Sequence, residues 1–201
     1  MENFGEERGL YMNEKVYRTE LTPVSFLRRS AYMFPDKEAV VHGDRRYTYQ
    51  EFEERVNRLA SRLKDEGFQK GDRIAFLCPN IPPMLEGTFA IPAAGLVMVA
   101  INTRLGKNEV EYIVEHSKSK MVFVDHELEE LLEGIDESVE VVRIDDTGEE
   151  GDPYEDYLAE GSPEPVESVL EDEEEMISVN YTSGTTGQPK AVMYNHRNAY
   201  I

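Results

Sequence analysis

The stretch Tyr181-Thr-Ser-Gly-Thr-Thr-Gly-Gln-Pro-Lys190 gathers hydroxyl side chains, two glycines and one cation in a short segment. Glycines let a backbone approach an anion and turn its N–H groups inward, hydroxyls are neutral donors, and a lysine supplies a positive charge that phosphates can share. The composition of this stretch therefore predicts a loop that binds phosphate groups.

Two common phosphate-binding loops do not match this stretch. A Walker loop requires Gly-x-x-x-x-Gly-Lys followed by Ser or Thr, whereas Gly184 and Gly187 are three residues apart and Lys190 follows three residues later. The dinucleotide-binding pattern Gly-x-Gly-x-x-Gly occurs nowhere in the chain. The loop therefore belongs to neither class.

The residues on either side of the loop are typical of β-strands. Ile177-Ser-Val-Asn-Tyr181 leads into it and Ala191-Val-Met-Tyr194 follows it, and both runs are rich in β-branched, aromatic and apolar residues. We therefore predict that the loop joins two strands. A hairpin turn without a ligand is the alternative, because Gly, Ser, Thr and Pro are also common turn residues.

The whole stretch resembles the signature of the adenylate-forming enzymes, which include acyl-CoA synthetases, luciferases and the adenylation domains of peptide synthetases. That signature reads Tyr/Phe-Thr-Ser-Gly-Ser/Thr-Thr-Gly-x-Pro-Lys-Gly-Val, and the chain matches each defined position except one. Ala191 stands where the family usually has glycine. Because a side chain disfavours positive φ, we expect an ordinary backbone conformation at Ala191.

An amphipathic helix is predicted well before the signature. Thr48 and Glu51 have the spacing of a capping box, and apolar residues then recur at helical spacing until Gly67. Together with the Lys70-Gly-Asp-Arg-Ile-Ala75 segment, this region resembles the opening of an acyl-CoA synthetase. The resemblance covers residues 21–201, and Asn102-Thr-Arg-Leu105 is most similar to fatty acyl-CoA synthetases and related carboxylate:CoA ligases.

An α/β fold is also predicted from the apolar pattern alone, because short apolar runs alternate with segments of helical periodicity. Strands are expected at residues 39–41, 73–77, 96–101, 121–124, 139–144 and 177–181, and helices at 49–66, 82–94, 108–116 and 127–133. This alternation predicts a mostly parallel sheet with flanking helices and ligands at the carboxyl ends of its strands. By resemblance, residues 21–201 form an incomplete N-terminal AMP-binding domain, preceded by a lead segment at residues 1–20.

The net charge of −20 is concentrated in one segment. Residues 127–175 contain 22 acidic residues and one basic residue, Arg143, which leaves 19 acidic and 20 basic residues in the rest of the chain. This composition predicts a solvated, partly mobile surface region, and binding of a cation or a basic partner is the alternative. The sign of the charge disfavours nucleic acid and anionic membrane as partners.

Several residues that often mark special chemistry have ordinary interpretations. Cys78 is the one cysteine and lies in an apolar run, which predicts a buried, reduced thiol in a cytoplasmic protein. The histidines lack the paired spacing of a metal site, so no structural metal is expected. His196 is expected to cap or support the next helix, with a place at the nucleotide site as the alternative. Prolines and a charge within residues 81–101 disfavour a membrane span, and no secretory leader is recognised at the start of the chain.

A two-step reaction is what the resemblance implies. A carboxylate attacks the α-phosphorus of ATP to give an acyl-adenylate and pyrophosphate, and the thiol of CoA then displaces AMP to give a thioester. In such an acid–thiol ligase the loop would hold the β- and γ-phosphates with Mg²⁺. The residues assigned to this role are the hydroxyl donors Thr182, Ser183, Thr185 and Thr186, the close-approach glycines Gly184 and Gly187, and the cation Lys190. Tyr181 is expected to pack at the strand end.

Later motifs of the family, including its catalytic lysine, have no counterpart in these 201 residues. We therefore expect an N-terminal part of an acyl-CoA synthetase that does not complete adenylation alone. Two alternatives stay open. One is another adenylate-forming ligase, which activates an aryl or amino acid. The other is a non-catalytic phosphate-binding module that self-associates through an unpaired sheet edge.

Overall fold

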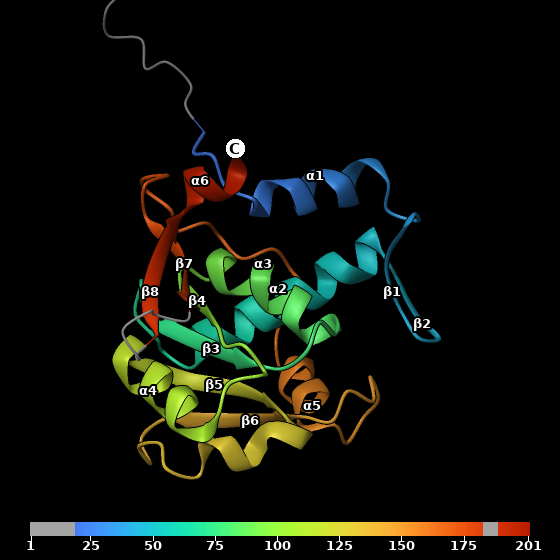
Figure 1. Ribbon diagram of the computed structural model, residues 1–201. Helices are drawn as coiled ribbons and strands as arrows, with labels where there is room; N and C mark the ends of the chain where they lie inside the picture. Colours follow the sequence, from blue (N-terminus) through green and yellow to red (C-terminus); the bar gives the residue numbers. More distant parts are fainter. Residues whose placement is uncertain (1–18, 183–188) are drawn as a thin grey trace, which may run out of the picture.

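A six-stranded sheet organises the chain, for which the computed structural model describes residues 19–182 and 189–201 (Figure 1). The strands lie in the order β6-β5-β3-β4-β7-β8. Their bounds are β3 Arg73–Leu77, β4 Val97–Ala100, β5 Ser119–Asp125, β6 Glu140–Ile144, β7 Met176–Thr182 and β8 Lys190–Asn195. Neighbouring strands from β6 to β7 are parallel, and β8 is antiparallel to β7. The predicted mostly parallel sheet is confirmed.

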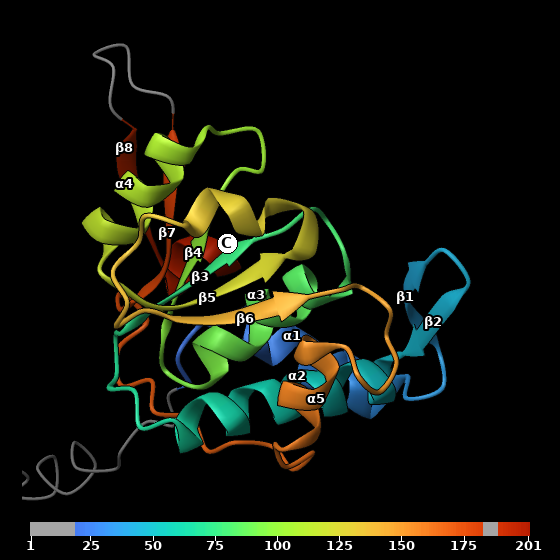
Figure 2. The same cartoon turned by 90° about the horizontal axis from the view of Figure 1, so that it is seen from below.

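Helices cover both faces of this sheet (Figure 2). On one side lie α2 (Tyr49–Asp65), α3 (Pro82–Ala93) and α5 (Pro153–Ala159), with α1 (Val24–Met33) packed against α2 and α3. On the other side lie α4 (Lys107–Ser117) and η3 (His126–Leu132), which is a 3-10 helix rather than the α-helix that the sequence suggested. A short helix, α6 (His196–Tyr200), follows β8.

The centre of the sheet is buried on both faces. Ile74 and Phe76 of β3 pack into the apolar cluster under α2 and α3, whereas Ala75 and Leu77 pack into the cluster under α4. All four residues are fully buried. Burial on both faces explains why the sequence of β3 reads as a continuous apolar run rather than an alternating one.

Helix α2 begins where the sequence predicted. The Thr48 Oγ1 accepts a hydrogen bond from the Glu51 amide at 3.2 Å, and the Thr48 amide donates to the Glu51 carboxylate at 2.8 Å. These reciprocal bonds satisfy amide groups that would otherwise be unpaired at the helix start. The helix buries its apolar stripe, including Phe52, Val56 and Leu59, against the sheet.

One expected strand forms outside the main sheet. Residues 39–41 lie in β1 (Glu38–His42), which pairs only with β2 (Arg45–Thr48) in a separate antiparallel hairpin. Gly43 occupies the turn with a φ of 57°, a conformation that favours glycine. This hairpin projects from the body of the molecule in both views (Figures 1 and 2).

The acidic segment at residues 127–175 contributes regular structure as well as surface. It contains β6 and α5, and Ile144, Tyr154 and Leu158 are buried in the core. Its last turn is held by ion pairs: the Glu175 carboxylate accepts from the Lys70 ammonium at 2.8 Å, and Glu173 pairs with Arg197. Mobility of the rest of this segment stays a prediction.

A buried charge network connects three helices on the α2 face. The Arg55 guanidinium of α2 donates to the Glu86 carboxylate of α3 at 2.6 Å and to the Glu155 carboxylate of α5 at 2.7 Å. The Tyr154 hydroxyl donates to the other oxygen of Glu86, also at 2.6 Å. Glu86 is completely buried, and these bonds offset the free-energy cost of removing its carboxylate from water.

No helix in the described ranges combines the length and the apolar composition that a bilayer crossing requires.

Candidate phosphate-binding site

The two ends of the signature stretch face each other across a strand pair. β7 ends at Thr182 and β8 begins at Lys190, and these two residues are direct partners in the antiparallel register. The prediction that the loop joins two strands is confirmed. Five of the assigned residues lie outside the described ranges, so their placement stays a prediction: Ser183, Gly184, Thr185, Thr186 and Gly187.

Ala191 adopts the ordinary conformation expected of it. It lies within β8 and pairs with Tyr181. Lys118 and Asp146 are the non-glycine residues with positive φ in the described part of the chain. The departure from the family signature at Ala191 therefore introduces no backbone strain at the start of β8.

The Lys190 ammonium is available to an external anion. Both Thr182 and Lys190 are exposed. Among residues 19–182 and 189–201, no carboxylate lies within ion-pair distance of Lys190, although the chain has a large excess of acid. An unpaired, accessible cation beside a hydroxyl suits phosphate oxygens, because charge-assisted hydrogen bonds to an ionised group are the strong ones.

The strand that leads into the loop is fixed to α4 by an aromatic residue. The Tyr181 hydroxyl lies 2.8 Å from Nδ1 of His116, which is on α4, and the two rings are nearly perpendicular. Burial raises the pKa of Tyr181, with a further contribution from Tyr112. Tyr181 therefore packs at the strand end as predicted. The role of His116 was missed, because the two residues are 65 positions apart and no local pattern connects them.

His196 is remote from the loop. His196 follows Lys190 by six positions along the extended chain of β8, which is roughly 20 Å. The ring is buried, and its Nδ1 lies 3.0 Å from the Thr22 hydroxyl. Burial lowers its pKa below the ordinary value. The interpretation that His196 supports the helix holds, whereas the Asn195 side chain provides the actual cap by accepting from the Asn198 amide at 2.7 Å.

Cys78 is buried, and burial raises the pKa of its thiol well above the usual range. A thiol held in its protonated form is a poor nucleophile. The sequence prediction of an unreactive core cysteine is therefore supported.

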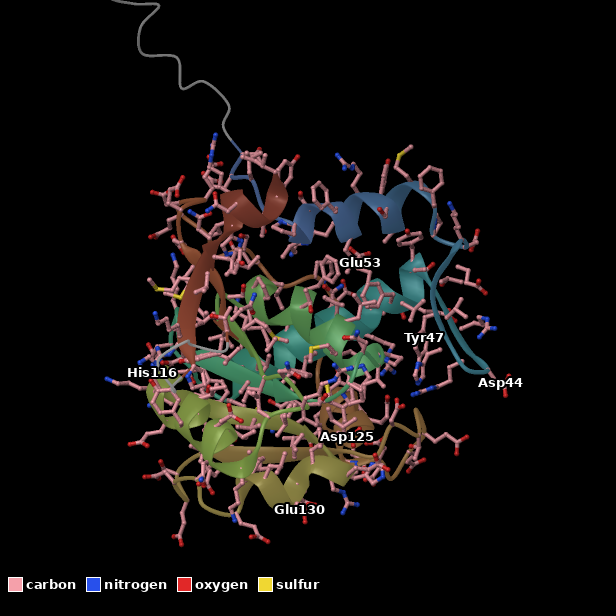
Figure 3. The ribbon with its side chains drawn as sticks, viewed as in Figure 1. Asp44, Tyr47, Glu53, His116, Asp125 and Glu130 are labelled. Carbon is pink, nitrogen blue, oxygen red and sulfur yellow. The ribbon has the colours of Figure 1, made fainter. Side chains whose placement is uncertain are left out.

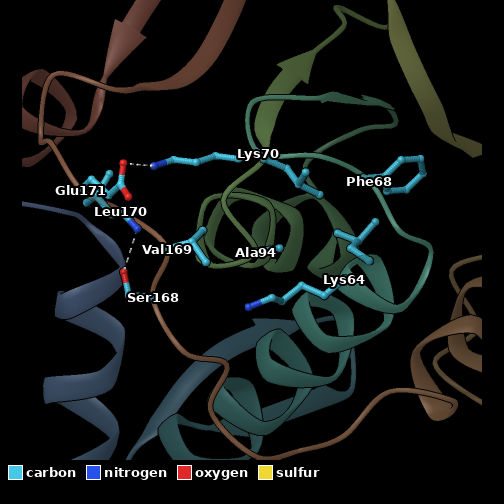
Figure 4. Close-up of a pocket in the computed structure, with 10 residues that line it drawn as sticks. Lys64, Phe68, Lys70, Ala94, Ser168, Val169, Leu170 and Glu171 are labelled. Atoms are coloured by element: carbon cyan, nitrogen blue, oxygen red, sulfur yellow. Dashed lines mark hydrogen bonds and ion pairs between the residues drawn. The ribbon is translucent and has the colours of Figure 1, made fainter.

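A cavity of about 450 Å³ lies under the segment that approaches β7 (Figure 4). The ammonium groups that line it already have partners within the protein. Apolar side chains such as Phe68 and Val169 form much of its lining. The Lys70 ammonium is bound by Glu171 at 3.5 Å and by Glu175, and the Lys64 ammonium donates to a backbone oxygen at 3.2 Å. This cavity therefore lacks the free cation that distinguishes the base of the β7–β8 loop.

Comparison with curated proteins gives related ligases. The chain is similar to 4-hydroxybutyrate–CoA ligase 2 of Metallosphaera sedula, with 41% identity over 193 residues that cover 90% of this chain and 35% of the relative. It is also similar to a peroxisomal acetate/butyrate–CoA ligase of Arabidopsis thaliana, with 36% identity over 205 residues that cover 91% of this chain and 36% of the relative. The chain thus spans about a third of the length of the curated relatives that it matches.

Solved structures with the same architecture come from the same group of enzymes. The anthranilate CoA ligase AuaEII, in complex with anthranoyl-AMP, matches with a TM-score of 0.81 and 26% identity over 90% of this chain and 36% of that chain. The N-terminal domain of FACL13 from Mycobacterium tuberculosis matches with a TM-score of 0.76 and 28% identity, over 87% of this chain and 44% of that chain. The family described as AMP-binding enzyme matches residues 27–201, and the chain belongs to this family.

Proposed function

We propose that this chain carries the ATP phosphate-binding hairpin of an acyl-CoA synthetase, an acid–thiol ligase that converts a carboxylic acid to its CoA thioester through an acyl-adenylate. Family membership and the relatives named as CoA ligases support the reaction class. The observation that carries the proposal is the pairing of Thr182 with Lys190, which closes the signature as a strand–loop–strand unit whose basal cation has no carboxylate partner among the described residues.

The carboxylate attacks the α-phosphorus of ATP. The bond between this phosphorus and the oxygen that bridges to the β-phosphate breaks, and pyrophosphate leaves with the electron pair. In our proposal the Lys190 ammonium shares the charge of the departing β- and γ-phosphates. The Thr182 hydroxyl donates to their oxygens, together with Ser183, Thr185 and Thr186. Gly184 and Gly187 would let the backbone come close. These groups hold the leaving pyrophosphate in line, which is how proteins contribute most to phosphoryl chemistry.

Magnesium would be held at this site mainly through phosphate oxygens. In the described ranges no group of three or more His, Cys, Asp or Glu side chains could hold a metal ion. Mg²⁺ commonly keeps several waters and is bound through substrate phosphates with few protein ligands. Exposed hydroxyl and ammonium groups at the loop base are compatible with such a phosphate-bound ion and do not form a protein cage for it.

The substrate that we propose is a carboxylic acid, with CoA as the acceptor of the acyl group. Relatives are named for 4-hydroxybutyrate, for acetate or butyrate, for trans-cinnamate and for benzoate, so the names cover both aliphatic and aromatic acids. Several are named as peroxisomal. A cytoplasmic location remains the expectation from the sequence, and imaging of the tagged protein in its own cells would separate the two compartments.

Calorimetric titration with Mg²⁺-pyrophosphate tests the proposal. Lys190→Ala should weaken binding about 10- to 100-fold, because a hydrogen bond to a charged group contributes about 1.5–3 kcal/mol. Lys120→Ala is the matched control, since Lys120 is also exposed and lies on β5, which pairs with neither β7 nor β8. Equal affinities for the wild-type chain and both variants would contradict the proposed role of Lys190.

A further inference from the structure

We propose that Tyr181 and His116 form a positioning contact that fixes the base of the phosphate-binding hairpin against α4. The purpose that we assign to this contact rests on the proposed function, whereas the contact itself can be tested without any ligand. Neither residue is assigned to touch ATP. Their role is to hold the strand from which Thr182 extends.

The face of β7 that points toward α4 ends at Tyr181. Side chains alternate along a strand, so Ile177, Val179 and Tyr181 share one face. Val179 is buried in the same apolar cluster as Val110, Ile113 and Val114 of α4, and Tyr181 packs against that cluster. Tyr181 is therefore the last described side chain on this face before the loop.

The partner strand does little to fix the loop end. Residues 190–194 of β8 are all exposed, and Met193 is 68% exposed. Pro189, just before β8, is buried. Beyond its pairing with β7 and its contacts with α6, β8 makes no extensive contact with another described element. The position of Lys190 is therefore set by the buried Pro189 beside it and by the pairing with β7, and the anchor of β7 nearest to Lys190 is Tyr181.

The contact between Tyr181 and His116 is both polar and aromatic. The phenol oxygen lies 2.8 Å from the imidazole Nδ1, so the hydroxyl donates when Nδ1 carries no proton. The ring centroids are 5.8 Å apart with an interplanar angle of 86°, an edge-to-face arrangement. His116 in turn packs on Tyr112 with centroids 5.2 Å apart. Figure 3 shows His116 on the side of the molecule where α4 meets β7 and β8.

The end of α4 that carries His116 is itself fixed to the centre of the sheet. Arg73, the first residue of β3, donates from Nε to the Ser117 carbonyl at 2.7 Å and from Nη2 to the Lys118 carbonyl at 3.3 Å. These carbonyls are among the unpaired acceptors at a helix end. A continuous series of contacts therefore runs from buried β3 through α4 and His116 to Tyr181.

The consequence concerns the geometry of the phosphate site. Thr182 follows Tyr181 directly and pairs with Lys190, so a shift of the Tyr181 backbone would move both groups together. Displacements of about 1 Å in positioning groups can cost about 100-fold in rate. A hydrogen bond at a partly exposed site is a modest interaction, so its loss should loosen the hairpin base without unfolding the domain.

Amide hydrogen exchange by NMR tests the contact in the free chain. Tyr181→Phe removes the hydroxyl and keeps the ring, and His116→Leu removes the imidazole nitrogen. Each should accelerate exchange about 3- to 10-fold at those amides of the β7–β8 ladder nearest the loop that are protected in the wild-type chain, as expected for a hydrogen bond of average strength, with amides of β3 unchanged. The double variant should be no faster than either single variant. His116→Asn, which places a polar atom near the position of Nδ1, should restore slow exchange.

Pyrophosphate titration of the same variants tests the purpose of the contact. Tyr181→Phe should weaken binding about 3- to 10-fold relative to wild type. If the wild-type chain itself binds no pyrophosphate, the proposed function fails for this chain, whereas the exchange measurement still decides the contact. Unchanged exchange at the hairpin base in Tyr181→Phe, or additive effects of the two single variants, would overturn the inference.

Discussion

β3 and β8 belong to one sheet but differ completely in burial. Residues 74–77 of β3 are fully buried, whereas residues 190–194 of β8 are all exposed. The central strand can only stabilise, because water and ligands do not reach it. The edge strand contributes little apolar burial, and for the same reason its lysine can meet a charged ligand. The buried centre of the sheet therefore stabilises the fold, whereas its exposed edge provides the proposed phosphate-binding lysine.

The charged groups of the two regions differ in the same way. Arg55 is bound by Glu86 and Glu155 inside the protein, so its charge is neutralised by contacts that hold α2, α3 and α5 together. Lys190 has no such partner among the described residues. A cation that is neutralised internally builds the fold, whereas a cation left unpaired at an exposed strand end can bind an anion.

The largest effect should come from breaking the buried network. Arg55→Ala leaves the Glu86 carboxylate buried with the Tyr154 hydroxyl but without a positive charge, which should lower the free energy of unfolding by about 3–5 kcal/mol. Arg46→Ala is the control, because the exposed pair of Arg46 with Glu38, at 3.4 Å, should contribute no more than about 1 kcal/mol. Urea denaturation measures both values. Similar losses in the two variants would mean that burial does not set the strength of these pairs.

A smaller effect should separate two valines of the sheet. Val99 of β4 is fully buried and Val192 of β8 is 38% exposed. Val99→Ala removes two buried methyl groups and leaves a small cavity, so it should cost about 2 kcal/mol of unfolding free energy. Val192→Ala should change stability by less than about 0.5 kcal/mol. If Val192→Ala were as costly as Val99→Ala, β8 would be covered in solution by something that the structure does not contain.

The smallest effect concerns pH. His196 is buried at the far end of β8, and burial lowers its pKa in the folded state below the ordinary value of 6.5. Unfolded chains take up a proton near pH 6.5 and folded chains do not, so stability is complete above that pH and is lost as pH falls through the lowered folded pKa. The contribution is at most about 1.4 kcal/mol per pH unit. Melting temperatures between pH 7 and 5 should fall less steeply for His196→Asn than for wild type. Parallel slopes for the two proteins would show that His196 does not titrate differently on folding.

Local signals in the sequence predicted the parts of the fold that depend on neighbours in the chain. The capping box at Thr48 and Glu51 gave the start of α2, and the apolar run at residues 73–77 gave β3. Helix α5 was not predicted, although Asp152 and Pro153 form a regular helix start, because acidic composition dominated the interpretation of that segment. The 3-10 geometry of η3 was not evident either, since about two turns of either helix have similar apolar spacing.

Contacts between distant residues could not be predicted from one sequence. Residues 39–41 have the composition of any strand, and nothing local indicates that they pair with β2 instead of joining the main sheet. The bond between Tyr181 and His116, and the network around Glu86, depend on elements that only the fold brings together. For the candidate site, the residue types and the strand–loop–strand arrangement were predictable, whereas the anchor that holds it was not.

The most direct test of the central claim is to titrate the wild-type chain and Lys190→Ala with pyrophosphate and with AMP, both in the presence of Mg²⁺. If the exposed end of β8 holds the β- and γ-phosphates of ATP, Lys190→Ala should weaken pyrophosphate binding about 10- to 100-fold and leave the affinity for AMP unchanged. Equal weakening of both ligands, or none for pyrophosphate, would contradict the assignment of Lys190 to the leaving phosphates.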